Sequence, residues 1–322
     1  MSIHRFLRTA LFILVGAVST FAPAADLEAQ GDQRAVLVTG ATSGIGRYTA
    51  ELLADRGFFV YAGARSDEDM AELNAIPNMM AVRLDVTVQE QIDAAVETIQ
   101  AEGRGLHGLI NNAGVAILEP LIEVEEEDLF FQLDVNVFGP YRVTKAFAPM
   151  LIESQGRVST TGSLSGFVTW PFGGPYTMSK HAVEAYTEVL ALELEQFGVT
   201  VSVVEPGNFN SRIYESLAQR REERGIGAEG SRYGEAIDGM INRALTERNA
   251  PEPTAVAEAF YHAMSSDAPK SNYLVVPVEG EAAFTLQSML NRLVEVNRDH
   301  EYSFTREELI EMLDRAMGES GR

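Results

Sequence analysis

Cysteine is absent from the 322-residue sequence, which excludes disulfides, thiolate catalysis and cysteine-based metal sites. Histidine is also scarce, and its five copies do not share the close spacing of metal ligands. We therefore expect no metal site. The five histidines are His4, His107, His181, His262 and His300.

Basic side chains are few as well: 25 lysines and arginines stand against 47 aspartates and glutamates, for a formal net charge of −22. A surface this acidic repels a phosphate backbone, so we expect no nucleic-acid partner. No proline- or serine-rich linker divides the chain, and 46% hydrophobic residues suffice for a large core. We expect a single domain with an extension at each end.

The N-terminal segment has the layout of a targeting sequence. Basic residues precede an apolar run from Ala10 to Ala22, and Ala22-Pro23-Ala24 fits a small-x-small cleavage pattern. This predicts a secretory signal peptide over residues 1–25. The run is shorter than the ~20 residues of a bilayer span, although an uncleaved membrane anchor remains an alternative. The expected location is exported, periplasmic or membrane-anchored, and cytoplasmic if the start codon is mis-assigned.

Short apolar runs alternate with helical stretches after residue 34. Runs with apolar side chains at nearly every position are typical of strands buried on both faces of a parallel sheet. The alternation predicts a doubly wound α/β (Rossmann) sheet of about seven strands over residues 34–280, with ligands at the carboxyl ends of the strands. The expected strands are 35–39, 58–62, 80–84, 106–110, 157–161, 199–204 and 273–276, and expected helices include 44–56, 88–102, 125–153, 177–197 and 253–265.

Two segments depart from this alternation. Residues 207–250 hold several glycines and many charges, and we expect an inserted helical flap with a mobile loop on the substrate side. Residues 281–322 predict a C-terminal extension of two short helices, with Thr305 as the N-cap of the second.

A glycine-rich loop, Thr39-Gly40-Ala41-Thr42-Ser43-Gly44-Ile45-Gly46, follows the first expected strand and opens the first expected helix. Gly40 permits the tight exit from the strand, Gly44 lets the backbone approach a pyrophosphate, and Gly46 lets helix and strand pack closely. Amides at the helix N-terminus then face the anion. The context predicts a dinucleotide site that includes Ser43 and Ile45, with a ligand-free structural turn as the alternative.

The end of the second expected strand indicates which dinucleotide binds. An acidic side chain there would bind the ribose 2′-hydroxyl and repel a 2′-phosphate. The strand ends Ala62-Gly63-Ala64-Arg65-Ser66, without a carboxylate. Arg65 can pair with a phosphate instead, unless it is a surface arginine that points elsewhere. We therefore favour NADP(H) over NAD(H).

Tyr176 and Lys180 lie four residues apart at the start of a helix and so share one helix face. A tyrosine ordinarily titrates near ~10, too high for proton exchange at neutral pH. A neighbouring ammonium stabilises the phenolate and lowers that pKa, and the same lysine can bond the nicotinamide ribose. Ser163 ends the fifth expected strand, where its hydroxyl can hold the substrate oxygen as charge develops.

The glycine loop, Asn136, Ser163 and the Tyr176–Lys180 pair stand in the order and spacing of the short-chain dehydrogenase/reductase family, whose compact branch residues 34–280 resemble. The resemblance implies an oxidoreductase that interconverts an alcohol and a carbonyl compound, with these four polar side chains as its catalytic tetrad. It also implies that Asn136 bends its helix and holds a water that relays protons to Lys180. Further implied cofactor contacts are Asp85, Val86, Asn112, Ala113, Gly114, Pro206, Gly207 and Ser211, the last in place of the family's threonine.

The substrate side carries less specific signals. Residues 166–174 include the single tryptophan, Trp170, and with the flap could wall an apolar pocket, although packing of the loop alone is an equal alternative. Residues 172–206 resemble the retinol-dehydrogenase and 17β-hydroxysteroid-dehydrogenase-like members, which implies a hydrophobic small-molecule alcohol or ketone. By the same resemblance we expect a homodimer or homotetramer that pairs through the long helices after the fourth and fifth strands.

Three other functions fit the sequence less well. A nucleotide-sensing or scaffolding protein of this fold would carry a damaged tetrad, and the tetrad here is intact. A sugar-nucleotide epimerase prefers the spacing G-x-x-G-x-x-G and a larger C-terminal domain. A hydrolase elbow needs glycine two residues before and two after one serine, and neither Ser163 nor Ser165 meets that condition.

Overall fold

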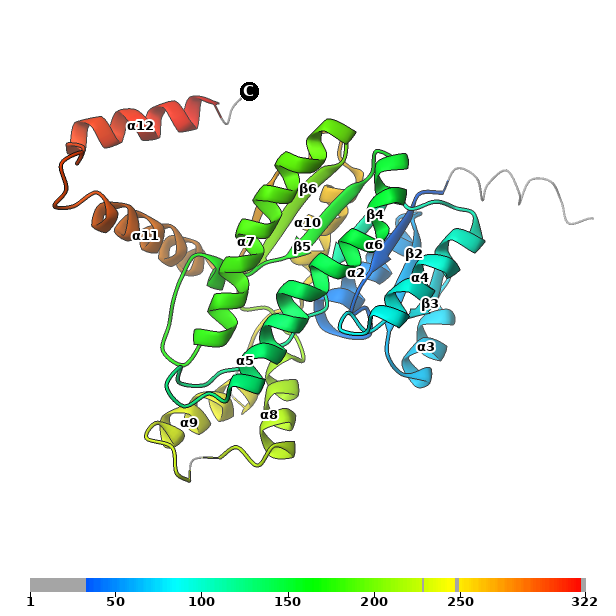
Figure 1. Cartoon of the computed structure of the whole chain (residues 1–322), viewed down its shortest axis with the longest axis horizontal. Helices are drawn as coiled ribbons and strands as arrows, with labels where there is room; N and C mark the ends of the chain where they lie inside the picture. The colour runs from blue at the N-terminus through cyan, green and yellow to red at the C-terminus, as the bar shows by residue number, and fades with distance from the viewer. Residues whose placement is uncertain (1–32, 228, 247–248, 320–322) are drawn as a thin grey trace, which may run out of the picture. The chain divides into compact units, whose positions relative to one another are not determined.

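Seven parallel strands form one sheet in the order β3-β2-β1-β4-β5-β6-β7, flanked by helices (Figure 1). This confirms the predicted Rossmann-like α/β fold. The order reverses between β1 and β4, which is where such sheets bind ligands at their carboxyl edge. The strands are β1 (Ala35–Val38), β2 (Phe59–Ala64), β3 (Met79–Arg83), β4 (Gly108–Asn111), β5 (Arg157–Thr161), β6 (Thr200–Pro206) and β7 (Asn272–Val275).

The computed structural model describes residues 33–227, 229–246 and 249–319. The segment predicted as a signal peptide or anchor, residues 1–25, lies outside them, so its role stays a prediction. In the described ranges, no helix combines the length and apolar character needed to span a bilayer.

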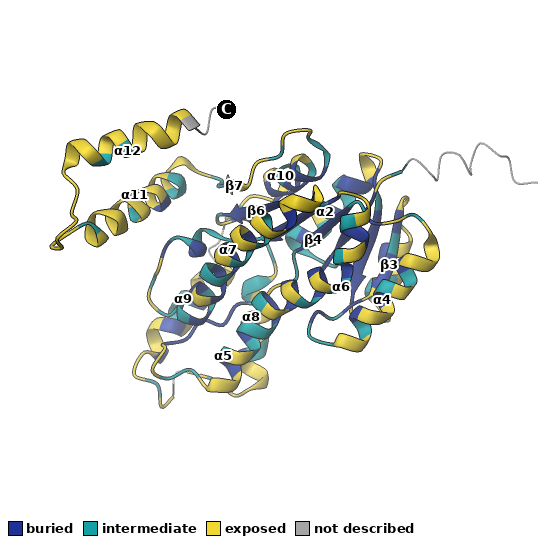
Figure 2. Ribbon diagram, turned by 45° about the horizontal axis from the view of Figure 1, so that its top comes forward, coloured by how far each residue is buried: buried dark blue, intermediate teal, exposed yellow. Residues whose placement is uncertain are grey.

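Helices cover both faces of the sheet, as strands buried on both faces require (Figure 2). On one face α2 (Gly44–Asp55), α3 (Asp67–Asn74) and α10 (Thr254–Ser265) pack through Leu53, Leu73 and Phe260. On the other face α4 (Gln89–Glu102), α6 (Gly139–Glu153) and α7 (Gly174–Leu194) pack through Ile92, Phe147 and Leu194. Helix α7 continues into the 3₁₀ turn η3 (Glu195–Phe197).

The helical stretch predicted over 125–153 is interrupted in its middle. Helix α5 (Glu126–Leu133) passes into a π-helical turn, η1 (Asp134–Phe138), before α6 begins. The turn contains the buried Asn136. A π-turn widens the helix by one residue and often marks a functional position.

Two further helical segments are the flap, inserted in the connection from β6 to α10, and the C-terminal extension after β7. The predicted flap contains α8 (Ile213–Glu223) and α9 (Gly234–Thr246), which confirms its helical character. The C-terminal extension contains α11 (Glu279–Val296) and α12 (Arg306–Glu319), and much of their surface is exposed (Figure 2). Thr305 caps α12 as predicted: its hydroxyl accepts the Glu308 amide at 3.3 Å, and its own amide donates to the Glu308 carboxylate at 2.7 Å.

Candidate active site

The glycine loop has the backbone that the predicted dinucleotide site needs. Gly40 and Gly44 have φ angles of 63° and 53°, in the left-handed region that favours glycine. A side chain on Gly46 would collide with the Gly40 carbonyl and with Asn112, so helix and strand do pack closely there. Ser43 precedes α2 without capping it through its hydroxyl. The first-turn amides of α2 are therefore suited to a pyrophosphate.

The glycine loop is tied to the end of β4. The Thr39 hydroxyl accepts the backbone amides of Asn112 at 2.9 Å and Ala113 at 3.0 Å. The Asn112 amide group donates to the carbonyls of Thr39 and Gly40, both at 3.1 Å. The side chain of Asn112 thus fixes the shape of the glycine loop. Gly114 comes next in this segment. A Cβ added to Gly114 would lie 3.5 Å from the side-chain oxygen of Asn136.

Arg65 and Asp85 meet at the adjoining edge of the sheet. Arg65 is 77% exposed, and its guanidinium lies 3.8 Å from the Asp85 carboxylate. Asp85 also accepts the Thr87 amide at 2.9 Å. Arg83, which the sequence analysis did not single out, bonds both the Arg65 carbonyl and the Asp67 carboxylate. Arg83 thereby neutralises Asp67, an acidic side chain two residues after Arg65.

The loop after β6 lies against the glycine loop. A Cβ added to Gly44 would approach Ser211 at 3.4 Å, so two of the predicted cofactor segments are adjacent. The amide of Gly207, the residue after Pro206, donates to Val275 on β7 at 2.7 Å. The first turn of α11 contributes Glu281, whose carboxylate accepts the amide of Asn208 at 2.9 Å.

Asn136 holds the π-turn to the segment after β4. Its side-chain oxygen accepts the Val115 amide at 2.8 Å, and its nitrogen donates to the Val115 carbonyl at 3.0 Å. The same nitrogen contacts the Ser179 hydroxyl at 3.1 Å, on the turn of α7 that carries Lys180. The predicted disruption of the helix at Asn136 is present. Its amide meets the neighbour of Lys180 rather than Lys180 itself.

Ser163, Tyr176 and Lys180 converge where β5 ends and α7 begins. Lys180 is buried, and its ammonium donates to the Thr161 carbonyl at 2.7 Å. The Lys180 nitrogen lies 5.6 Å from the centre of the Tyr176 ring. Ser163 caps the 3₁₀ turn η2 (Leu164–Gly166) by accepting the Ser165 amide at 3.1 Å, and it also hydrogen-bonds Tyr176. The structure therefore brings these three predicted residues together.

The predicted lowering of the Tyr176 pKa by Lys180 is not found in this structure. Burial raises the pKa of Tyr176 to about 12, although the hydrogen bond with Ser163 opposes the rise. Burial also lowers the pKa of Lys180 to about 8, against the attraction of Glu184. Desolvation outweighs the tyrosine–lysine interaction because both groups lie in a poorly hydrated region.

An apolar cluster surrounds Tyr176 and joins the flap to the aromatic loop. Its buried members include Leu118, Leu217 and Ile237, and Trp170 and Tyr176 pack against it. The Trp170 indole donates to Ser165 at 3.1 Å. The flap and residues 166–174 thus form one apolar wall beside the tyrosine, as the sequence analysis allowed.

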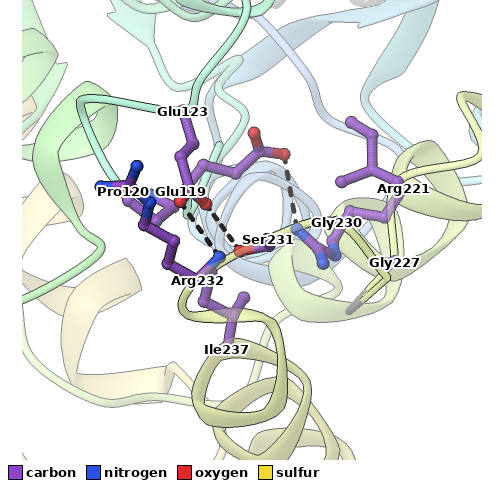
Figure 3. A pocket seen from close by; sticks show the side chains of 10 residues that line it. Glu119, Pro120, Glu123, Arg221, Gly227, Gly230, Ser231, Arg232 and Ile237 are labelled. Atoms are coloured by element: carbon purple, nitrogen blue, oxygen red, sulfur yellow. Dashed lines mark hydrogen bonds and ion pairs between the residues drawn. The ribbon is translucent and has the colours of Figure 1, made fainter.

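Charged side chains fasten the flap to the rest of the domain. Asp128 on α5, 1% exposed, receives two hydrogen bonds from Arg220 on α8 at 3.0 and 2.5 Å. A pocket of about 330 Å³ lies nearby, between the segment after β4 and the flap (Figure 3). In its wall Arg221 lies 3.4 Å from Glu119, and Ser231 donates to Glu123 at 2.6 Å. These paired charges attach the flap to the segment after β4, and Ile237 is shared between the pocket wall and the apolar cluster at Tyr176.

Comparisons with known proteins agree with this geometry. Residues 34–222 match the family model described as short chain dehydrogenase. An uncharacterised oxidoreductase of Escherichia coli strain K12, YbbO, is 32% identical over 248 residues, which cover 76% of this chain and 87% of that protein. The chain belongs to the short-chain dehydrogenase/reductase family and is an NAD(P)-dependent oxidoreductase by that membership.

Two solved structures are similar to this chain and contain cofactor. A short-chain dehydrogenase/reductase from Burkholderia phymatum in complex with NAD has 25% identity and a TM-score of 0.70, covering 86% of this chain and 99% of that one. A metagenomic short-chain oxidoreductase in complex with NADP has 25% identity and a TM-score of 0.59, covering 76% of this chain and 97% of that one. Both cofactors therefore occur among the relatives.

Proposed function

We propose that the protein is an NADP(H)-dependent oxidoreductase that interconverts a hydrophobic secondary alcohol and its ketone, or an aldehyde, at Tyr176. The observation that carries the proposal is the convergence of Tyr176, Ser163 and Lys180 beside an apolar wall. The bound cofactor supplies or accepts the hydride at the reacting carbon.

In the direction of reduction, Tyr176 gives its hydroxyl proton to the carbonyl oxygen, which the Ser163 hydroxyl holds in place. Lys180 stabilises the resulting phenolate. The π-turn at Asn136 is suited to hold a water for proton transfer to Lys180, because a widened turn leaves room in the backbone ladder. Oxidation reverses each transfer.

The glycine loop and the α2 N-terminus would hold the pyrophosphate, and Asp85 and Val86 would meet the adenine end. Arg65 supports NADP(H) because it is exposed near Asp85 while Arg83 engages the nearby Asp67. Asn112, Ala113 and Gly114 would support the adjacent ribose. At the other end, Pro206, Gly207 and Ser211 would contact the nicotinamide.

Two copies of the chain pair, we propose, through α6 and α7. These helices border an apolar surface groove of about 470 Å³ whose lining includes Tyr141, Tyr186 and Val189. Val189 is 52% exposed, and nearby on α7 Leu192 is 74% exposed. Exposed apolar residues clustered on one face are typical of an interface. Leu192→Glu should convert the dimer or tetramer to a monomer, which light scattering would detect.

The activity is tested by screening steroid, retinoid and decalin-type alcohols and carbonyl compounds with NADP⁺ or NADPH, and with NAD⁺ or NADH. Tyr176→Phe should retain cofactor binding and lose turnover. Tyr186→Phe, which removes another hydroxyl of α7, is the matched control and should stay active. If wild type and Tyr176→Phe both bind cofactor and neither turns over any compound, the protein is a nucleotide sensor or scaffold instead.

A further inference from the structure

The C-terminal extension contacts the loop after β6 through the first turn of α11, and the steps above do not use this contact. Helix α11 has a single buried residue, Thr285, whose hydroxyl donates to the Glu281 carbonyl at 2.8 Å. Farther along the helix, Leu286 and Leu293 are 54% and 48% exposed. The extension is therefore anchored at the N-terminal end of α11.

The loop of residues 207–211, directly after β6, borders the proposed dinucleotide site. It follows the carboxyl end of a strand, which is where ligands bind in parallel sheets of this kind. A Cβ added to Gly44 in the glycine loop would lie 3.4 Å from Ser211. The shape of the 207–211 loop therefore affects how the cofactor is held.

Hydrogen bonds fix four successive amides of this loop. The amides of Gly207, Phe209 and Asn210 donate to backbone carbonyls at 2.7, 2.9 and 2.8 Å. The amide of Asn208 donates to a side chain instead, Oε2 of Glu281, at 2.9 Å. A carboxylate is a stronger acceptor for an amide than a neutral group is. The bond to Glu281 is thus the one of the four that a side-chain substitution can remove.

Gly207 makes room for the Glu281 carboxylate. A Cβ on Gly207 would collide with Oε2 of Glu281, and it would also lie 3.1 Å from Pro277 and 3.2 Å from Val276. Gly207 does not have a positive φ, so its backbone conformation alone does not require glycine. The side chain is missing where α11 and the segment before it pack directly on the loop.

The place of Glu281 within α11 would also suit a different role. Glu281 is the third helical residue after the N-cap Val278, where a glutamate can cap its own helix or interact favourably with the helix dipole. Its carboxylate bonds Asn208 instead, 73 residues earlier in the chain. A dipole interaction needs the negative charge, whereas the bond to Asn208 needs an oxygen at the right reach.

Building on the proposed function, we propose that Glu281 is a positioning residue whose carboxylate holds the 207–211 loop in the shape that receives the nicotinamide end of the cofactor. The loop is then already formed when the cofactor arrives, so binding does not have to order it. Loss of the bond should weaken the hold on the nicotinamide end. The adenosine end, which the glycine loop and Arg65 would hold, should be unaffected.

Isothermal titration calorimetry on the full protein tests this with two ligands: NADPH and 2′-phospho-ADP-ribose, which lacks the nicotinamide. Glu281→Ala should weaken NADPH binding about three- to tenfold, the effect of one hydrogen bond, and leave binding of the nicotinamide-free compound unchanged. Glu279→Ala, an exposed position in the same turn of α11, is the matched control and should bind both compounds like wild type. NADH and ADP-ribose are the corresponding pair if the chain prefers NAD(H).

Two further substitutions separate this role from an effect on the α11 dipole. Glu281→Gln keeps an oxygen at the same reach and loses the charge, so it should restore most of the NADPH affinity. Glu281→Asp keeps the charge but is one methylene shorter, so it should bind NADPH as weakly as Glu281→Ala. The reverse order would show that charge at the helix N-terminus matters and would overturn the proposal.

Equal weakening of both ligands in Glu281→Ala, or NADPH binding as tight as in wild type, would also overturn it. If Glu281→Ala does not fold, the contrast between Glu281→Gln and Glu281→Asp decides in the same way. A wild type that binds NADPH but turns over no compound counts against the proposed function alone, whereas one that binds no dinucleotide overturns both. In an active enzyme, Glu281→Ala should raise KM for NADPH and leave KM for the alcohol or carbonyl substrate nearly unchanged.

Discussion

The Lys180 ammonium donates to the Thr161 carbonyl at 2.7 Å and thereby joins the end of β5 to the start of α7. We expect Lys180→Arg to reduce kcat/KM by about 100-fold although it keeps the charge, because a planar guanidinium cannot occupy the position of a compact ammonium. Steady-state kinetics measure the loss, with Lys145→Arg on the exposed face of α6 as the control. A variant with wild-type kcat/KM would show that charge alone matters at this position.

Asn136 should matter for stability as well as for proton transfer. Asn136→Ala removes both hydrogen bonds to Val115 and the contact with Ser179. We expect the free energy of unfolding to fall by about 1–3 kcal/mol, because the half-buried Val115 amide loses its partner and the Val115 carbonyl keeps only the Gln132 side chain at 2.9 Å. Urea denaturation measures the change. Ser179→Ala keeps both Val115 bonds, although it removes the Ser179 bond to the Tyr176 carbonyl at 2.7 Å as well as the Asn136 contact, and it should cost less. Equal losses would contradict the assigned role of the Val115 bonds.

Arg65 should select the cofactor. Arg65→Ala should raise KM for NADPH by about 10-fold or more and leave KM for NADH nearly unchanged, since a charge-assisted bond to the 2′-phosphate is lost. Kinetics with each cofactor give the ratio. Arg56→Ala removes an arginine that pairs with Glu258 and serves as the control. Equal increases for both cofactors would indicate that Arg65 acts on a part of the dinucleotide that the two share.

Glu205, which is buried near the end of β6, should make stability depend on pH. Its pKa rises from 4.5 to about 7 on folding, so between these values the folded protein holds a proton that the unfolded chain has released. The contribution of Glu205 to stability is thus complete below about pH 4.5 and is lost as the pH rises through about 7.

Relative to wild type, Glu205→Gln should therefore gain about 1–3 kcal/mol of unfolding free energy between pH 4 and pH 8. Denaturation at several pH values gives the difference between the two proteins, which removes the contribution of carboxyl groups other than Glu184, whose pKa the charge of Glu205 raises. Glu188→Gln, an exposed position on α7, should show no such trend. Parallel curves for Glu205→Gln and wild type would disprove the burial argument.

The sheet could be predicted because its signals are local and repeated. Each strand is a short apolar run, and glycine ends the first run where the chain must turn sharply. Helix α3 was not among the predicted helices, since it is only eight residues long and has a single buried residue, Leu73. Its signal was the Ser66 cap, whose hydroxyl accepts the Asp69 amide at 3.1 Å.

The tetrad could be predicted from spacing, whereas the electrostatics around it could not. Tyr176 and Lys180 necessarily share a helix face, but their pKa values depend on burial, which for Tyr176 includes packing against the flap of residues 207–250. Glu184 on α7 and Glu205 on β6 are separated in sequence and meet only because α7 packs against β6. Arg83 likewise could not be singled out from the sequence, because only the pairing of β2 with β3 places it beside the end of β2.

Trp170 is the sole indole of the chain, and it packs against the cluster that holds Tyr176 and the flap. Its ultraviolet emission therefore originates at the proposed substrate wall and nowhere else in the protein. Entry of an apolar compound, or displacement of α8 and α9, will change the wavelength and intensity of the Trp170 fluorescence. The molecule thus contains a built-in optical probe, which needs neither a label nor turnover.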